Sequence, residues 1–212
     1  FTLNKPAAGD FGLCEKDGEQ YLCVGDESLL STADLKIRGR HNYANVLAAM
    51  ALGSSIGLPM SAMLEAVREF PGLEHRTQWV AEINGVNWFN DSKGTNVGAT
   101  LAAIEGLPGK HVLIAGGQGK GADFMPLRNI AEQRLRAVVL IGEDAKKIAQ
   151  AIDQMVPVKF ADDMDDAVHL AADFAQPGDN VLLSPACASF DMFQGFAHRG
   201  EVFMKAVEAL KS

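Results

Sequence analysis

Beyond residue 73 the chain alternates between short apolar runs and amphipathic segments of helical length. Continuous apolar runs such as residues 137–141 are typical of strands that are buried on both faces. The expected strands are 80–83, 86–89, 111–115, 137–141, 156–160 and 180–183, and the expected helices are 96–105, one starting beyond 123, 143–153, 163–175 and one ending near 210. This alternation predicts an α/β fold with a doubly wound, mostly parallel, Rossmann-like sheet.

Residues 1–72 follow a different pattern. Apolar runs separated by turn residues predict β-strands up to about residue 36, and two helices are expected at 41–56 and 60–70. Pro71-Gly72 is the expected domain boundary. A few strands of this size make a poor domain alone, and Phe1 is not a methionine. We therefore expect 1–72 to be the end of a larger domain whose earlier part precedes residue 1.

Composition narrows the possible functions. The chain has 212 residues, of which 48% are hydrophobic, with a mean hydropathy of +0.03, so we expect a globular protein. No apolar run has transmembrane length and no signal segment opens the chain, which makes the cytoplasm the expected compartment. The net charge of -8 and the lack of a basic cluster argue against a nucleic-acid partner. An anionic ligand must then be held by local groups.

The cysteines and histidines give no metal-binding signal. Cys14, Cys23 and Cys187 stand at no metal-ligand spacing, and we expect them to be reduced thiols. The histidines are dispersed, so a zinc site is not expected, although a metal could bind through the phosphates of a nucleotide.

A polar stretch, Asp91 to Asn96, follows the second strand of a hairpin that Asn84-Gly85 is expected to close. Open α/β sheets bind their ligands at the carboxyl ends of strands, which is where this stretch lies. The alternative is a polar turn that caps a helix starting at Asn96.

The glycine-rich loop 115–124 follows the next strand and carries Lys120. Its glycines would let backbone amides approach an anion, and Lys120 could pair with a carboxylate or phosphate. Gly117, Gly119 and Ala122 also satisfy a dinucleotide-binding pattern. That match is weak, because Asp123 is the expected helix cap, whereas a Rossmann helix begins inside the glycine run. The alternative for Lys120 is a solvated side chain on a flexible loop.

Residues 184–191 follow the last strand, and Ser189 is expected at the start of the last helix, where amides and the helix dipole favour an anion. The three loops should then meet at one edge of the sheet. The alternative is that Ser189 only caps its helix. Elsewhere, Asn42 and Asn45 share one face of a helix and could cap it or contact a base, while Arg76 could bridge domains or reach a phosphate.

Five motifs occur in a fixed order. They are His41-Asn42-Tyr43-Ala44-Asn45, His75-Arg76, Asn90-Asp91-Ser92-Lys93-Gly94-Thr95-Asn96, Gly116-Gly117-Gln118-Gly119-Lys120 and Leu183-Ser184-Pro185-Ala186-Cys187-Ala188-Ser189. In this order and spacing they resemble the Mur ligases of peptidoglycan synthesis, most closely those that add D-glutamate. The resemblance covers nearly the whole chain.

This resemblance implies an ATP- and Mg²⁺-dependent, cytoplasmic, monomeric amide ligase that joins D-glutamate to UDP-N-acetylmuramoyl-L-alanine through an acyl phosphate. It implies that residues 1–72 end the central ATP-binding domain and that 73–212 form the amino-acid-binding domain. The implied ATP contacts are Asn42, Asn45, Arg76 and Asp91. The implied D-glutamate contacts are Thr95, Lys120, Ser189 and Phe196.

The chain also departs from the family pattern. It has no Walker-type phosphate loop, no candidate for the modified lysine and glutamate that hold Mg²⁺, and no uridine-nucleotide domain. We expect these parts before residue 1, and we expect residues 1–212 alone to be inactive, with no metal ligands and no assigned catalytic residue. The alternatives are another Mur ligase or a folylpolyglutamate-synthetase-like ligase, a non-catalytic nucleotide- or amino-acid-binding module, and an NAD-binding oxidoreductase with Glu143 on the ribose.

Overall fold

The computed structural model describes residues 1–152 and 154–211. It divides into two compact units, Phe1–Gly72 and Leu73–Ser212, and each is described by itself.

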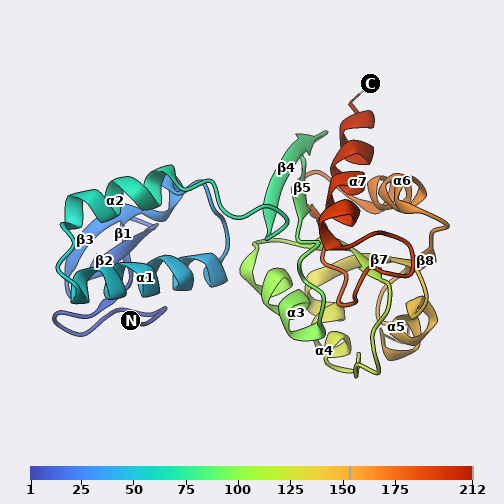
Figure 1. Ribbon diagram of the computed structural model, residues 1–212, viewed down its shortest axis with the longest axis horizontal. Coiled ribbons are helices and arrows are strands. Elements are labelled where there is room, and N and C mark those ends of the chain that lie inside the picture. Colours follow the sequence, from blue (N-terminus) through green and yellow to red (C-terminus); the bar gives the residue numbers. More distant parts are fainter. Residues whose placement is uncertain (153, 212) are drawn as a thin grey trace. The chain divides into compact units, whose positions relative to one another are not determined.

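The second unit is built on a six-stranded sheet in the order β4-β5-β9-β6-β7-β8 (Figure 1). The strands are β4 (Gln78–Ile83), β5 (Val86–Asn90), β6 (His111–Gly116), β7 (Leu135–Ile141), β8 (Val158–Phe160) and β9 (Asn180–Leu183). All neighbours pair in parallel except the β4–β5 hairpin. Asn84 and Gly85 close that hairpin with φ angles of 53° and 77°, as the Asn-Gly pair predicts.

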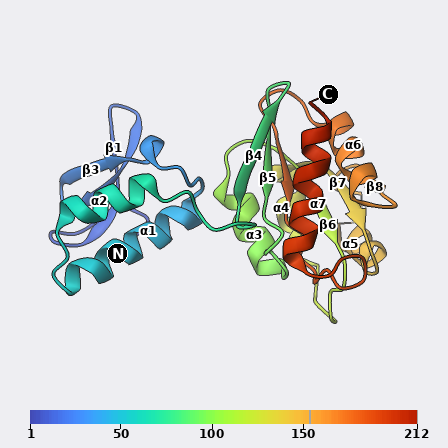
Figure 2. The same ribbon diagram turned by 45° about the horizontal axis from the view of Figure 1, so that its top comes forward.

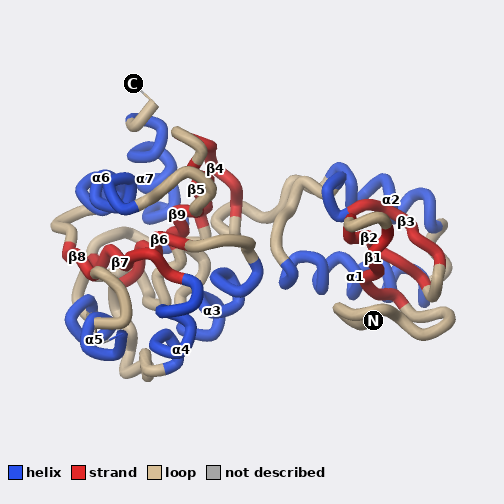
Figure 3. The backbone as a smooth tube through the Cα atoms, turned by 180° about the vertical axis from the view of Figure 1, so that it is seen from behind, coloured by secondary structure: helices blue, strands red, loops and turns tan. Residues whose placement is uncertain are grey.

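Helices cover both faces of this sheet, which confirms the doubly wound α/β fold (Figures 2 and 3). The helices are α3 (Val97–Gly106), α4 (Pro126–Arg134), α5 (Ala145–Ile152), α6 (Met164–Phe174) and α7 (Phe196–Ala209). One core lies under α3, α4 and α5, and a second core lies under α6 and α7. Successive residues of the central strands enter opposite cores, for example Val138 and Val139, which explains the uninterrupted apolar runs.

The predicted elements are present with boundaries that shift by a few residues. At the strands the largest shifts are two residues: β4 and β7 begin two residues earlier than predicted, and β8 begins two residues later. The helix predicted over 143–153 is α5, and residue 153 lies outside the described residues. The start of the last helix differs more, and it bears on the site described below.

The first unit packs two helices against a three-stranded antiparallel sheet in the order β1-β2-β3. Its elements are β1 (Phe11–Lys16), β2 (Glu19–Val24), β3 (Glu27–Ser31), a short 3-10 turn η1 (Thr32–Asp34), α1 (Arg40–Ser55) and α2 (Met60–Glu69). Leu22 and Leu47 are fully buried at the centre of the core. Gly57, with φ 79°, follows the first helix where its end was predicted.

The expectation of three reduced thiols is wrong for one pair. Cys14 in β1 and Cys23 in β2 form a disulfide, with their Cα atoms 6.1 Å apart. The antiparallel register pairs Cys14 with Tyr21 and Gly12 with Cys23, so the two cysteines are diagonal neighbours. Spacing along the chain does not reveal this contact, because it depends on the register of the strands. Cys187 is a free, buried thiol.

His111 begins β6 as a fully buried imidazole. Its Nε2 lies 3.0 Å from the carbonyl oxygen of Ile104, and its Nδ1 lies 3.3 Å from the Asn180 amide nitrogen. This arrangement fits the neutral tautomer in which Nε2 donates and Nδ1 accepts. Burial, followed by the nearby charge of Arg134, lowers the pKa of His111 to about 4.

We predict that this histidine makes the second unit less stable in acid. Its pKa is lower in the folded chain than in the unfolded chain, so its stabilisation is present above pH of about 6.5 and is lost as the pH falls toward about 4. Relative to His111→Gln, the wild-type chain should lose about 3 kcal/mol of unfolding free energy over that range. Denaturant titrations of both proteins at several pH values measure this difference. An unchanged difference across the range would contradict the prediction.

Candidate functional site

Three loops meet at the carboxyl edge of the second sheet, as expected. They follow β5, β6 and β9, and β9 pairs with both of the other strands. The Gly116 amide donates to the Pro185 carbonyl at 2.9 Å, and the Ala186 amide donates to the Gly94 carbonyl at 2.9 Å. Backbone hydrogen bonds therefore join the β9 loop to each of its neighbours.

The loops after β6 and β9 are joined most tightly at Gln118 and Ala188. Each amide of this pair donates to the other residue's carbonyl oxygen at 2.9 Å. Gly117 precedes this bridge with φ 121°, and a Cβ at that position would overlap the Ala188 carbonyl group. The glycine is therefore needed for the close approach of two backbones.

Several amides of the glycine-rich loop, those of Gln118, Gly119 and Ala122, donate to protein oxygens. The Gly119 amide donates to Asp144 Oδ2 at 2.7 Å, and the Asp144 amide returns a hydrogen bond to the Gly117 carbonyl at 3.0 Å. The dinucleotide pattern also lacks its helix, because α4 begins only at Pro126. The N-cap is Met125 rather than the predicted Asp123, whose side chain instead accepts from the Met125 amide at 2.9 Å. The oxidoreductase hypothesis therefore has no geometric support here.

Lys120 is an exposed cation on the loop after β6. It has a left-handed backbone with φ 52°, which is uncommon for a residue with a side chain. Its Nζ lies 5.9 Å from the centroid of the exposed Phe190 ring. The amides of Gly119 and Ala122 are hydrogen-bonded within the protein, and Lys120 adds an exposed ammonium group that can pair with an anion.

Asp91 is buried at the end of β5, with 7% of its surface exposed. Its Oδ1 accepts from the Thr77 amide at 3.0 Å, and its Oδ2 accepts from the Ser184 hydroxyl at 2.7 Å. Burial raises the pKa of Asp91 to about 6, and the hydrogen bonds from Ser184 and Thr77 oppose this effect. Asp91 thus fixes the turn before β4, a structural role that sequence reasoning missed.

That turn carries Arg76. His75 and Thr77, on either side, both have positive φ angles, and both are buried while Arg76 is exposed. The His75 carbonyl accepts from the Lys93 backbone amide at 3.0 Å. The His75 ring nitrogen Nδ1 lies 3.0 Å from the side-chain nitrogen Nδ2 of Asn90. The structure thus brings Arg76 and Asp91 onto two segments that are bonded to each other.

The last helix begins later than predicted. It starts at Phe196, with Gly195 as its N-cap, so Ser189 neither opens nor caps it. Ser189 is buried in a loop, where its carbonyl accepts from the amides of Met192 and Phe193. The amides of Ala186 and Ala188 bond to the two neighbouring loops, so the segment before Ser189 does not form the start of a helix.

Phe196 thus stands where Ser189 was expected, at the first turn of α7. Its ring lies under Lys93, with Nζ 3.8 Å from the ring centroid, which is a cation–π contact. Thr95 is half-buried on the β5 loop, and its amide donates to the Lys93 carbonyl at 2.8 Å. Asn96 caps α3 by accepting from the Ala99 amide at 2.9 Å, so the polar stretch both caps a helix and lies in the site.

The two predicted adenine contacts belong to the first unit. Asn42 donates from Nδ2 to the Arg38 carbonyl at 2.8 Å, so it stabilises the start of α1. Asn45 is exposed on the same helix.

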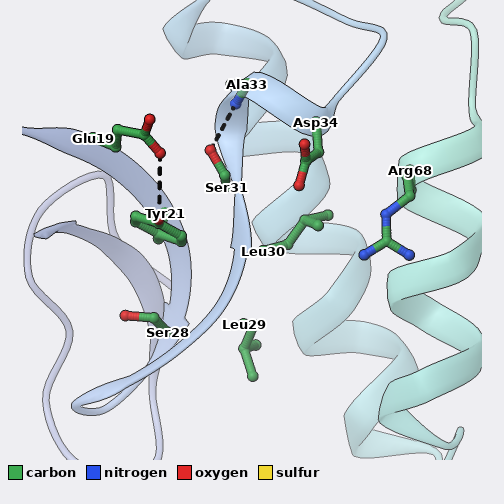
Figure 4. A pocket seen from close by; sticks show the side chains of 9 residues that line it. All are labelled: Glu19, Tyr21, Ser28, Leu29, Leu30, Ser31, Ala33, Asp34 and Arg68. Atoms are coloured by element: carbon green, nitrogen blue, oxygen red, sulfur yellow. Dashed lines mark hydrogen bonds between the residues drawn. The ribbon is translucent and has the colours of Figure 1, made fainter. Parts of the chain in front are cut away.

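The first unit also has a pocket of about 470 Å³ beside β3 and α2 (Figure 4). Arg68 and Asp34 lie at one side of it, and Tyr21 donates to Glu19 at 3.2 Å at the other. None of the predicted site residues lines this pocket, so we do not assign the functional site to it.

No metal centre is found in the described part of the chain. Among residues 1–152 and 154–211, no group of three or more His, Cys, Asp or Glu side chains could hold a metal ion. None of the helices in this part of the chain combines the length and the apolar character that a membrane span requires.

The model of the family "Mur ligase, glutamate ligase domain" matches residues 75–187. The match begins at the His75-Arg76 turn and includes the loops after β5 and β6. The chain belongs to the Mur ligase family. The predicted family resemblance is thereby confirmed, whereas the individual site residues stay predictions.

Relatives of this Mur ligase chain agree with the assignment. The UDP-N-acetylmuramoylalanine–D-glutamate ligase of Nitrosococcus oceani is 56% identical over 100% of this chain and 47% of its own length. The chain therefore spans about half the length of the curated relatives it matches.

Two Thermotoga maritima structures share the fold. UDP-N-acetylmuramate-alanine ligase has a TM-score of 0.61 at 18% identity, covering 94% of this chain and 46% of that one. MurF ligase in complex with ADP has a TM-score of 0.63 at 17% identity, covering 95% and 47%.

We predict that Asp91 destabilises the folded chain when it ionises. Its pKa is higher folded than unfolded, so its favourable contribution is complete below pH of about 3.8 and is lost as the pH rises through about 6. In Asp91→Asn, the amide can donate to Ser184 Oγ, which can in turn donate to Thr100 Oγ1, 3.1 Å away.

Relative to Asp91→Asn, the wild-type chain should lose about 3 kcal/mol of unfolding free energy between pH 3 and 7. Unfolding titrations across this range test the difference. His111 changes stability in the opposite direction, and it is the same in both proteins, so the comparison removes it. A wild-type protein that gains stability relative to the variant as the pH rises would refute the raised pKa of Asp91.

Proposed function

We propose that the protein containing this chain is an ATP-dependent ligase that joins D-glutamate to UDP-N-acetylmuramoyl-L-alanine. The observation that carries the proposal is the 56% identity, over the whole chain, to a relative named for this activity. The likeness to solved structures does not choose among amide ligases, since a folylpolyglutamate synthase from Mycobacterium tuberculosis matches with a TM-score of 0.64 at 16% identity.

The carboxyl edge offers an exposed cation to a carboxylate of the amino acid. The chain carries a net charge of -8, so anion binding depends on local cations such as Lys120. We assign Thr95, Lys120, Ser189 and Phe196 to D-glutamate. Lys120 would pair with a carboxylate, while Ser189 and Phe196 would bound the site from the β9 loop and the start of α7.

We assign Asn42 and Asn45 to the adenine, Arg76 to the phosphates and Asp91 to the ribose. Oδ1 of Asp91 accepts from both the amide and the hydroxyl of Thr77, whereas Oδ2 accepts only from the Ser184 hydroxyl, which leaves a lone pair of Oδ2 for a ribose hydroxyl. Arg76 is exposed between two residues with positive φ angles, so its side chain is accessible to a ligand. These contacts would position the nucleotide and neutralise charge, which is the main task of a protein in phosphoryl transfer.

In the proposed reaction, the substrate carboxylate attacks the γ-phosphorus of ATP and ADP leaves. The amine of D-glutamate then attacks the acyl phosphate, forms the amide bond and releases inorganic phosphate. Mg²⁺ would accompany the ATP, and we assign none of this chain's residues to it. We propose that the reaction takes place in the cytoplasm on a monomeric enzyme. Residues 1–212 contain no Walker-type loop, so we expect no ADP formation by them alone.

We predict that Lys120→Ala weakens the use of D-glutamate by the full-length enzyme. Loss of a charge-assisted hydrogen bond costs about 1.5–3 kcal/mol, so kcat/KM for D-glutamate should fall about 10- to 100-fold. ADP release is measured with UDP-N-acetylmuramoyl-L-alanine, with D-glutamate, L-glutamate, meso-diaminopimelate and D-alanine offered separately.

Lys146→Ala is the matched control, because it removes an equal charge from an exposed position on α5. It should leave the rate unchanged. Turnover with a different amino acid would keep the ligase class but replace the substrate. Equal activity of Lys120→Ala and wild type would remove Lys120 from the site.

A further inference from the structure

Arg199 places a guanidinium group at the centre of the loops that form the site. It lies in the first turns of α7 and is fully buried. Its Nε donates to Ser92 Oγ at 3.0 Å, and its Nη2 donates to the Ser92 carbonyl at 2.8 Å. Its Nη1 donates to the Cys187 carbonyl at 3.1 Å. One side chain thus joins the β5 loop, the β9 loop and the last helix.

This environment is costly for a cation. Burial lowers the pKa of Arg199 to about 10, so the group still carries its charge at neutral pH. The three acceptors are uncharged, and none of the ion pairs found among residues 1–152 and 154–211 includes Arg199. A buried charge without a paired carboxylate lowers stability unless its hydrogen bonds offset the loss of water. Such a residue needs an explanation beyond core packing.

The acceptors of Arg199 stand next to residues assigned to D-glutamate. Ser92 is three residues before Thr95, and its hydroxyl donates onward to the Phe196 carbonyl at 2.7 Å. Cys187 is two residues before Ser189. Three of the four assigned contacts therefore belong to segments that are linked through this guanidinium.

We propose that Arg199 is a positioning residue that holds Thr95, Ser189 and Phe196 at the spacing that D-glutamate requires. The proposal rests on the proposed function, and it assigns Arg199 no direct contact with substrate.

The Asp91 carboxylate, on the nucleotide side of the edge, has anchors that do not include Arg199. Asp91 is held by the Thr77 amide and the Ser184 hydroxyl. Its own amide donates to the Leu183 carbonyl at 2.8 Å, and its carbonyl accepts from the Gly94 amide at 2.7 Å. Loss of Arg199 should therefore affect the amino-acid contacts more than the ATP contacts.

A lysine at position 199 cannot make all the hydrogen bonds that Arg199 makes. The guanidinium is a planar fork whose donors reach Ser92 and Cys187 at the same time, whereas an ammonium group is a single point on a shorter side chain. Arg199→Lys keeps the charge but can satisfy only one of the two residues well. The comparison of Lys and Met at this position therefore separates charge from geometry.

The test uses the full-length enzyme with Arg199→Met, Arg199→Lys and the control Arg134→Met. Arg134 also donates to backbone carbonyls, those of Ile104 and Leu107, but it lies before β7 at the opposite edge of the sheet. Steady-state kinetics give KM for D-glutamate and for ATP separately. Amide hydrogen exchange follows residues 92–95 and 186–196 without reference to activity.

We expect KM for D-glutamate to rise about 10- to 100-fold in Arg199→Met, since small displacements of positioning groups have effects of this size. KM for ATP should change less than about threefold, and exchange should increase in both loop segments. Arg199→Lys should show the same pattern to a smaller degree. Arg134→Met should lower the melting temperature and leave both KM values unchanged.

The outcomes separate this inference from the proposed function. A wild-type enzyme that does not use D-glutamate would defeat the proposed function, and the exchange data would still decide whether Arg199 orders the loops. An active wild type with unchanged KM for D-glutamate in Arg199→Met would overturn the inference. Equal rises in both KM values, or the same rises in Arg134→Met, would also overturn it, because they indicate a general structural role. If Arg199→Met does not fold, Arg199→Lys carries the same comparison.

Discussion

The position of β9 between β5 and β6 is the constraint on which the rest of the site depends. Parallel pairing on both sides brings the carboxyl ends of three strands to one edge. The loops that leave those ends are then close enough for backbone hydrogen bonds, and the Gln118–Ala188 and Ala186–Gly94 bonds are the result. A strand that is last in the sequence thus joins residues that lie almost a hundred positions before it.

This arrangement determines how the edge can meet a negatively charged ligand. The amides of Gln118, Gly119 and Ala122 in the glycine-rich loop are hydrogen-bonded within the protein, so these N–H groups are not available to an anion. What faces outward are side chains on a fixed backbone, with Lys120 after β6 and Arg76 on the turn before β4. In an acidic chain this local placement of cations is a physical basis for selective anion binding.

The fixed backbone is obtained at some expense of stability. Asp91 and Arg199 are both buried. Burial raises the pKa of Asp91 and lowers the pKa of Arg199, so it favours the neutral form of each side chain. Each side chain also bonds a segment that carries proposed ligand contacts. His111 is also buried and perturbed, but it lies at the start of β6, where it joins Ile104 to Asn180 and serves the fold alone. Buried polar groups near the carboxyl edge and near the amino edge of one sheet thus have different consequences, because only the former hold the site.

The sequence by itself determined the alternation of strands and helices, the Asn84-Gly85 hairpin and the loops that carry the site, because apolar periodicity and turn chemistry act over a few residues. It also placed Lys120 and Asp91 at strand ends. Only the tertiary structure decided the start of the last helix at Phe196, the Cys14–Cys23 bond, and the roles of Asp91 and Arg199 as anchors. Each of these depends on partners that are distant in sequence or on strand register. Local propensity carries no information about such contacts, since pairing and burial are properties of the assembled fold.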